Sequence, residues 1–143
     1  MKASLQCGLT GTFKYTVPET KTVPYIYPEA ADFQVMPKVF ATGYLVALCE
    51  WACIELIKPH LDWPAEQSVG TQVNLSHTAA TPPGLTITVS TRLENIEGRK
   101  LTFKITAHDG VDQISEGMHE RFIIDPAKFE ARLDAKRAAA ARI

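Results

Sequence analysis

Apolar and polar residues alternate along several segments of the chain, a pattern typical of β-strands with one buried face. The first segment covers residues 9–17. Four more follow in the second half of the chain, and the short links between them, rich in Gly, Pro and Asp, require antiparallel neighbours. The pattern therefore predicts a meander of three hairpins. Its strands are expected at residues 70–79, 85–96, 101–108 and 111–124, with turns at 81–84, 97–98 and 109–110.

Residues 39–61 break this alternation and predict one long helix. The segment VFATGYLVALCEWACIELIKPHL is apolar on almost every side of such a helix. A surface helix has a single apolar stripe, so we expect this helix to be covered on most of its sides. Glu50, Glu55 and Pro59 favour a buried core helix over a membrane span.

Glu50 lies in the middle of this apolar helix. A buried carboxylate without a partner costs several kcal/mol, so Glu50 needs either a partner or a chemical task. Two structural explanations are that it faces a solvated edge, or that it pairs with an arginine across a dimer interface. The alternative is a functional role.

Residues 18–38 form a long connection that contains Pro18, Pro24 and Pro28 and has no clear period. Connections of this length often act as lids or binding loops. The aromatic residues of this lid-like loop would either cover a pocket or close the open end of the core; they are Tyr25, Tyr27 and Phe33.

Residues 125–143 predict a C-terminal helix, with Asp125 as the cap and Pro126 in the first turn. Phe129 and Leu133 are four residues apart, so they lie on one face and could dock the helix onto the sheet. The rest of this helix is expected to fray.

The predicted order is a strand, a long apolar helix and four antiparallel strands. A strongly curved antiparallel sheet can wrap around such a helix. We therefore predict an α+β protein with the hotdog fold, a sheet of about five strands around one central helix, as a single domain over residues 1–143. Two such sheets commonly join edge to edge, which favours a homodimer with its edge strands covered.

Composition narrows the functions that this domain can have. The 143 residues carry a formal net charge of -1 without a basic stripe, which argues against nucleic acid as a partner. The N-terminus lacks an apolar run of signal-peptide length, and Cys49 and Cys53 are most simply buried thiols, so a reducing cytoplasm is expected. His, Cys and carboxylate residues do not cluster at ligand spacing, so no metal is implied.

Three residues could together form an acyl-transfer site: Thr42, Glu50 and His77. Thr42 is eight residues before Glu50, so both can face one side of the helix. Taken singly, Thr42 is most often a helix cap or a solvated hydroxyl, and an inward His77 in a strand is more often a core residue than a catalyst. Spacing in the sequence does not show that the three meet.

Over residues 9–133 the chain resembles the fluoroacetyl-CoA thioesterase type of hotdog protein. The resemblance is carried by VFATGYLVALCEWAC, VGTQVNLSHTAATPPGLTITV and AHDGVDQISEGMHER. It implies that Thr42, Glu50 and His77 are the catalytic residues. It also implies four substrate-binding residues: Gly70, through its backbone N–H, and Phe33, Met36 and Arg121. Arg121 itself could bind coenzyme A phosphates or form an ion pair, with Glu120 or with a carboxylate of the partner chain.

At one position the chain departs from this resemblance, because the specialised enzyme has a phenylalanine where Met36 stands. Methionine is flexible and lacks a ring face. The resemblance therefore implies a general hydrolase of small acyl-CoA esters, which releases a carboxylate and free coenzyme A without a further cofactor. An enoyl-CoA hydratase and a non-catalytic acyl-CoA-binding module are the alternatives.

Overall fold

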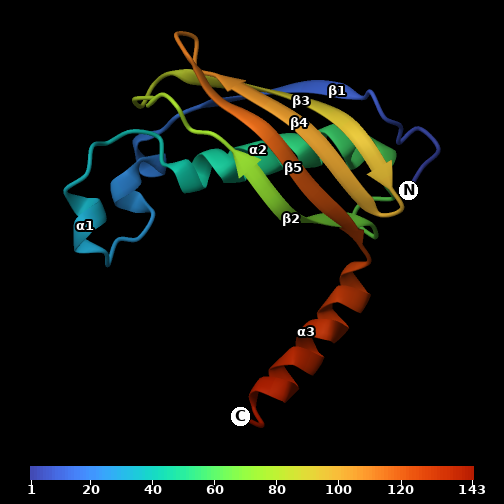
Figure 1. The fold of residues 1–143 in the computed structure, drawn as a ribbon. Helices are drawn as coiled ribbons and strands as arrows, with labels where there is room; N and C mark the ends of the chain where they lie inside the picture. The colour runs from blue at the N-terminus through green and yellow to red at the C-terminus, as the bar shows by residue number, and fades with distance from the viewer.

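The computed structural model describes all 143 residues as one antiparallel sheet with a long helix against one face (Figure 1). The predicted α+β hotdog architecture is confirmed. The strands are β1 (Thr10–Thr16), β2 (Gln67–Leu75), β3 (Thr86–Glu97), β4 (Lys100–His108) and β5 (Gln113–Ile124), and the helices are α1 (Ala31–Gln34), α2 (Thr42–Ile57) and α3 (Pro126–Ala140).

The sheet has the strand order β1-β3-β4-β5-β2, so the predicted meander of three hairpins is wrong in one place. β3, β4 and β5 form two hairpins, but β2 pairs with β5 at the opposite edge from β1. The reason is that the link after β2 is tied to the helix side of the molecule, because the Phe40 N–H donates to the Thr81 carbonyl at 2.8 Å. β3 then starts beside β1, across the sheet from β2.

The long helix is shorter than the sequence predicts. Phe40 pairs with Thr22 in an isolated β-bridge, which keeps the chain extended until Thr42. At the other end, the segment Lys58–His60 continues as a 3₁₀ turn that contains Pro59. Tertiary pairing at one end and proline at the other therefore set the limits of α2.

Only one side of α2 is covered within the protomer. Trp51 is 46 % exposed, so the expectation that most sides are covered is wrong for a single chain. The buried face carries Leu45, Leu48, Cys49, Ala52, Cys53 and Ile57. Both thiols are buried as predicted, and burial raises the pKa of Cys49 to about 12. They are therefore core residues and not nucleophiles.

β2 is an edge strand whose central part is exposed. Residues 70–74 are all open to solvent, and Val73 is 46 % exposed. The backbone groups on its outer side have no partner strand in the protomer. An open edge of this kind is a template for pairing with another strand.

The loop between β4 and β5 is a tight turn, as expected, but its central residues are Gly110 and Val111, one position later than predicted. The Asp109 N–H donates to the Asp112 carbonyl at 3.0 Å, and Gly110 takes a φ of 93°, which favours glycine. Asp109 instead anchors the turn. Its carboxylate accepts hydrogen bonds from the N–H groups of Val111 and Asp112 and from the buried Thr81 hydroxyl.

The lid-like loop contains two 3₁₀ turns and the short α1. The rings of Tyr27 and Phe33 contact each other, with centroids 5.9 Å apart, and Tyr25 and Tyr27 are 41 % and 56 % exposed. These two tyrosines therefore do not close the core. α1 lies beyond the start of α2, at one end of the sheet (Figure 1).

α3 begins as predicted, because the Asp125 carboxylate accepts hydrogen bonds from the N–H groups of Ala127 and Lys128. The expectation that Phe129 and Leu133 dock it onto the sheet is wrong: α3 has no buried residue and points away from the sheet on the side of β2 (Figure 1). It continues to Ala140. None of the helices is long and apolar enough to cross a membrane.

Asp109→Ala is expected to lower the free energy of unfolding by about 2 kcal/mol, because the buried Thr81 hydroxyl and two turn N–H groups lose their acceptor. Urea denaturation measures the change. Asp112→Ala is the matched control, since the exposed side chain of Asp112 makes no hydrogen bond. Equal stabilities of the two variants would contradict the anchoring role of Asp109.

Candidate active site

Thr42 and His77 meet at the start of α2. The Thr42 hydroxyl and Nδ1 of His77 are 2.7 Å apart. Ala41, not Thr42, is the residue that precedes the first helical turn, and Thr42 makes no capping hydrogen bond, so the interpretation of Thr42 as a cap is wrong. His77 lies just beyond the end of β2 and not in a strand. The structure thus pairs a hydroxyl with an imidazole at this end of the helix.

The other ring nitrogen of His77, Nε2, is buried and has no hydrogen-bond partner. Burial lowers the pKa of His77, although a backbone hydrogen bond with Ala79 acts in the opposite direction. The ring is therefore neutral at physiological pH. A neutral imidazole with one free nitrogen can accept or donate a proton to a bound molecule.

Glu50 forms an ion pair with Arg121 of its own chain, with Oε1 and Nη1 2.9 Å apart. Of the alternatives for these residues, Glu50 pairs with an arginine, but within its own chain, and Arg121 pairs with Glu50 and not with Glu120. The Glu50 side chain is 35 % exposed, whereas Arg121 is only 3 % exposed. The arginine therefore holds a carboxylate that solvent and a ligand can still reach.

Nε and Nη2 of Arg121 also make hydrogen bonds. Its Nε donates to the Ser68 hydroxyl at 2.8 Å, and Nη2 donates to the Ser68 carbonyl at 2.9 Å. These contacts tie β5, β2 and α2 together at one point. A guanidinium this buried, with Nε, Nη1 and Nη2 all in hydrogen bonds, supports an ion-pair role better than contact with the phosphates of coenzyme A.

His119 is a member of this cluster that the sequence analysis missed. Its Nδ1 lies 2.7 Å from the Gln72 carbonyl, which assigns the proton to Nδ1, and Nε2 then accepts a hydrogen bond from Arg121 at 3.1 Å. Burial lowers the pKa of His119; the Arg121 charge does so further, and the bond to Gln72 opposes both. The only signal in the sequence was its position two residues before Arg121, on the same face of a strand.

Gly70 lets the Glu50 carboxylate lie against the backbone of β2. A Cβ atom at Gly70 would come within 2.5 Å of Glu50 Oε1 and 3.2 Å of His119. The ladder between β2 and β5 is also irregular here, because the register shifts between Gly70 and Gln72. Thr71 is the extra residue of this bulge and has no partner in the ladder, whereas Gly70 stays in register with Arg121. The carbonyl-binding role of the Gly70 N–H remains a prediction, and the close approach of the Glu50 carboxylate to Gly70 is the feature that favours it.

The predicted site residues therefore form two clusters. One contains Thr42 and His77, and the other contains Glu50, Gly70 and Arg121. Eight residues of α2 separate Thr42 from Glu50, or about 12 Å along the helix axis, and no hydrogen bond joins the clusters. Of the two lid residues, Phe33 packs against Tyr27, and Met36 is 44 % exposed.

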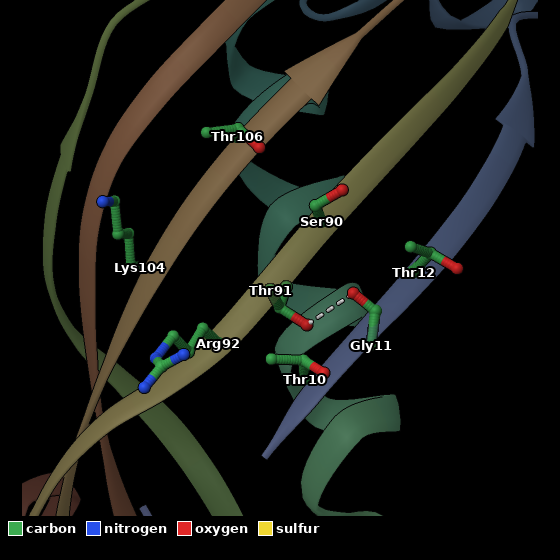
Figure 2. Close-up of a pocket in the computed structure, with 8 residues that line it drawn as sticks. All are labelled: Thr10, Gly11, Thr12, Ser90, Thr91, Arg92, Lys104 and Thr106. Carbon is green, nitrogen blue, oxygen red and sulfur yellow. Dashed lines mark hydrogen bonds between the residues drawn. The ribbon is translucent and has the colours of Figure 1, made fainter. Parts of the chain in front are cut away.

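Three of the hollows in the protomer lie elsewhere. One, of about 280 Å³, lies between β1 and the C-terminal part of α2, and its lining includes Glu55 and His60. The other two have no pair of a carboxylate and an imidazole. The larger of these two, of about 480 Å³, is on the sheet face opposite α2 (Figure 2) and is lined by Thr10, Gly11, Thr12, Ser90, Thr91, Arg92, Lys104 and Thr106. The smaller, of about 200 Å³, lies between β1 and α2, and its lining is apolar except for Lys21.

A curved sheet around one helix, a carboxylate held against a glycine of the edge strand and a hydroxyl–imidazole pair together define a thioester hydrolase of the hotdog class. The comparisons with known proteins agree. The model of the fluoroacetyl-CoA-specific thioesterase family matches residues 24–127. The fluoroacetyl-CoA thioesterase of Streptantibioticus cattleyicolor is 48 % identical over 136 residues, which are 95 % of this chain and 97 % of that protein. The chain belongs to this family.

Solved structures show the same likeness. One structure of the fluoroacetyl-CoA thioesterase FlK has a TM-score of 0.90 and 47 % identity, and the match covers 93 % of this chain and 98 % of that one. A thioesterase superfamily member from Thermus thermophilus has a TM-score of 0.83 and 27 % identity, with 99 % of both chains covered. A hotdog-like protein from Thermanaerovibrio acidaminovorans, at 17 % identity and a TM-score of 0.75, shares the fold.

Gly70→Ala is expected to lower thioester hydrolysis about 100-fold without unfolding the protein, because the added methyl group displaces the Glu50 carboxylate. Thiol release from a short-chain thioester measures this. Gly11→Ala in β1 is the matched control, since its methyl group meets the flexible end of Leu56 at 3.1 Å and lies at ordinary contact distance, 3.7 Å, from the Thr91 hydroxyl. Equal losses in both variants would contradict the role of Gly70.

The half-buried His77 and the buried His119 should make the protein less stable in acid. Their pKa values are lowered in the folded state, so below a pH of about 6.5 the unfolded chain binds more protons than the folded one. The free energy of unfolding should then fall by up to about 1.4 kcal/mol per pH unit for each ring, until the folded rings are protonated too. Urea denaturation between pH 5 and 8 measures this slope. His77→Gln and His119→Gln should each reduce the slope of the free energy of unfolding against pH. An unchanged slope in both variants would contradict the claim that these two imidazoles cause it.

Proposed function

We propose that the protein is an acyl-CoA thioesterase that hydrolyses a small acyl-CoA to a carboxylate and free coenzyme A, and that it acts as a cytoplasmic homodimer. The observation that carries this proposal is the Glu50 carboxylate, held by Arg121 against Gly70 while still one-third exposed. The relative at 48 % identity bears the name fluoroacetyl-CoA thioesterase, which supports an acyl-CoA substrate.

The chemistry assigns a role to each cluster. The thioester carbonyl binds at the Gly70 N–H, which stabilises the negative charge that develops on the oxygen. Glu50 either attacks the carbonyl carbon, so that water then hydrolyses the resulting anhydride, or removes a proton from an attacking water. The carbon–sulfur bond breaks in both cases. His77, whose resting ring is neutral, takes up a proton from solvent and passes it to the departing thiolate, and Thr42 orients the imidazole through their 2.7 Å contact.

A dimer would bring the two clusters closer together. Within one chain, His77 lies seven residues beyond Gly70, or about 23 Å along an extended strand. If the exposed edges of β2 pair antiparallel about a two-fold axis within residues 70–74, His77 of the partner subunit comes opposite the first half of β2, where Gly70 lies. A ligand could then contact Glu50 of one chain and the partner's His77.

The acyl group should be small and need not carry fluorine. Met36 is 44 % exposed and supplies a flexible apolar side chain to the lid instead of a ring. Solved structures of the relative include a threonine-to-alanine variant with bound fluoroacetate, which supports a threonine at the acyl site. A panel of acetyl-, fluoroacetyl-, branched and aryl-CoA esters with a thiol reagent tests the substrate class. Thiol release supports a thioesterase, whereas loss of enoyl absorbance without thiol would indicate a hydratase.

Glu50→Gln should lower kcat by at least about 1,000-fold and leave substrate binding intact, because the amide keeps an acceptor for Arg121 but is neither a base nor a nucleophile. Thiol release from acetyl-CoA, with binding measured by calorimetry, tests this. Glu55→Gln, an exposed carboxylate on the same helix, is the control and should keep wild-type activity. Hydrolysis retained in Glu50→Gln would remove the central role of this carboxylate.

A further inference from the structure

The C-terminal helix α3 has a basic stripe with no partner in the protomer. Lys128, Arg132 and Lys136 follow at four-residue spacing and so lie on one face, and none of them forms an ion pair. Arg137, on another face, is bound to Glu130 at 3.2 Å and Asp134 at 2.6 Å. The stripe is therefore a set of cations free to bind an anion.

The charge of the chain is divided unevenly between this helix and the rest. Residues 126–143 contain five Lys or Arg and two Asp or Glu, a net charge of +3, whereas the whole chain carries -1. The other residues therefore carry -4. The excess positive charge of the chain is therefore concentrated on α3, and a concentrated set of unpaired cations suits a strongly anionic ligand.

α3 begins far from the Thr42–His77 pair of its own chain. Gln67, at the start of β2, pairs with Ile124 at the end of β5, so α3 begins beside the start of β2. His77 follows the opposite end of β2, about 30 Å away along the nine-residue strand. Figure 1 shows α3 extending from this point past the β2 edge and away from the sheet.

In the proposed dimer, the start of α3 lies close to the Thr42–His77 pair of the partner subunit. Antiparallel pairing of two β2 edges places the start of one strand beside the end of the other. α3 then begins about two strand spacings, or about 10 Å, from the His77 end of the partner strand. Phe129 and Leu133 are half-buried without a covering element, and lie beside the basic stripe, where they can rest on the partner subunit.

We infer that the stripe of Lys128, Arg132 and Lys136 binds the phosphate groups of a coenzyme A ester whose acyl end lies at the Thr42–His77 pair of the partner subunit. This inference rests on the proposed thioesterase activity and dimer. Phosphates need charge-assisted donors, and Arg121 does not supply them, since it is buried and bound to Glu50 and Ser68. α3 is long enough to follow such a tail, at about 22 Å for its 15 residues.

The first experiment compares two thioesters of the same acyl group, acetyl-CoA and S-acetyl-N-acetylcysteamine, which lacks the nucleotide. The triple variant Lys128→Ala, Arg132→Ala, Lys136→Ala removes the three charges, and α3 should remain helical because alanine favours helices. This variant should raise the KM for acetyl-CoA about tenfold or more, with kcat unchanged. Its kinetics with the cysteamine ester should match the wild type. The control variant Lys14→Ala, Arg92→Ala, Lys104→Ala removes the same number and kinds of charge from exposed positions of the sheet and should change neither KM. Figure 2 shows two of these residues, Arg92 and Lys104, on the outer face.

The outcomes separate the inference from the function on which it rests. An unchanged KM in the α3 variant, with an active wild-type enzyme, overturns the inference and leaves the thioesterase intact. A rise in KM for both esters also overturns it, because the stripe would then act on the fold and not on the nucleotide. A rise only in the control variant would place the nucleotide on the outer face. A wild-type protein that releases no thiol from any ester would instead refute the proposed function.

A mixed dimer tests the contribution across subunits. One chain carries His77→Ala and an intact α3, and the other carries His77 and the α3 with the three alanine substitutions. A different affinity tag on each chain allows the mixed dimer to be isolated. Sedimentation equilibrium then checks that it has the mass of a dimer. The remaining His77 then has the intact α3 of the other chain beside it, so KM for acetyl-CoA should return to the wild-type value. A KM that stays raised would overturn the cross-subunit assignment.

Discussion

The ion pair between Arg121 and Glu50 is the interaction on which the site depends. Burying a guanidinium is unfavourable unless its charge and its N–H groups are satisfied. Here one carboxylate, one imidazole and both oxygens of a serine satisfy them, and these groups come from α2, β5 and β2. The same bonds that make the burial of Arg121 possible therefore fix the helix against the edge of the sheet and aim Glu50 at Gly70. A glycine is needed at that point because any side chain would occupy the space of the carboxylate.

A single protomer leaves three features open near this site. The helix is covered on one face only, and the edge strand that carries Gly70 exposes its backbone. The Thr42 hydroxyl contacts Nδ1 of His77, but Nε2 of the same ring has no hydrogen-bond partner. The free edge, the uncovered helix face and the unpaired nitrogen have a common explanation if another chain and a ligand meet at this edge. The position of α3, beyond the same edge, follows from the pairing of β5 with β2.

Periodicity predicted most of the fold correctly because it reflects local burial. The alternating segments became strands, and Asp125 and Pro126 started α3 as expected. Errors arose where a distant contact outweighed the local pattern. Phe40 pairs with Thr22, so α2 starts later than predicted. The Thr81 carbonyl accepts a hydrogen bond from the Phe40 N–H, which prevents a hairpin between β2 and β3. Phe129 and Leu133 form an apolar face on α3, but the sequence does not indicate which surface covers it.

The sequence by itself determined the residue types of the site and the family, because long stretches around Thr42, Glu50, His77 and Arg121 resemble known thioesterases. It also determined that one helix carries a carboxylate in an apolar setting. Only the tertiary structure decided that Arg121 is the partner of Glu50, that His119 joins them, and that Thr42 binds His77 and does not cap the helix. These contacts join residues up to 71 positions apart, and hydrogen-bond geometry at such separations depends on strand register and helix rotation, which no local pattern encodes.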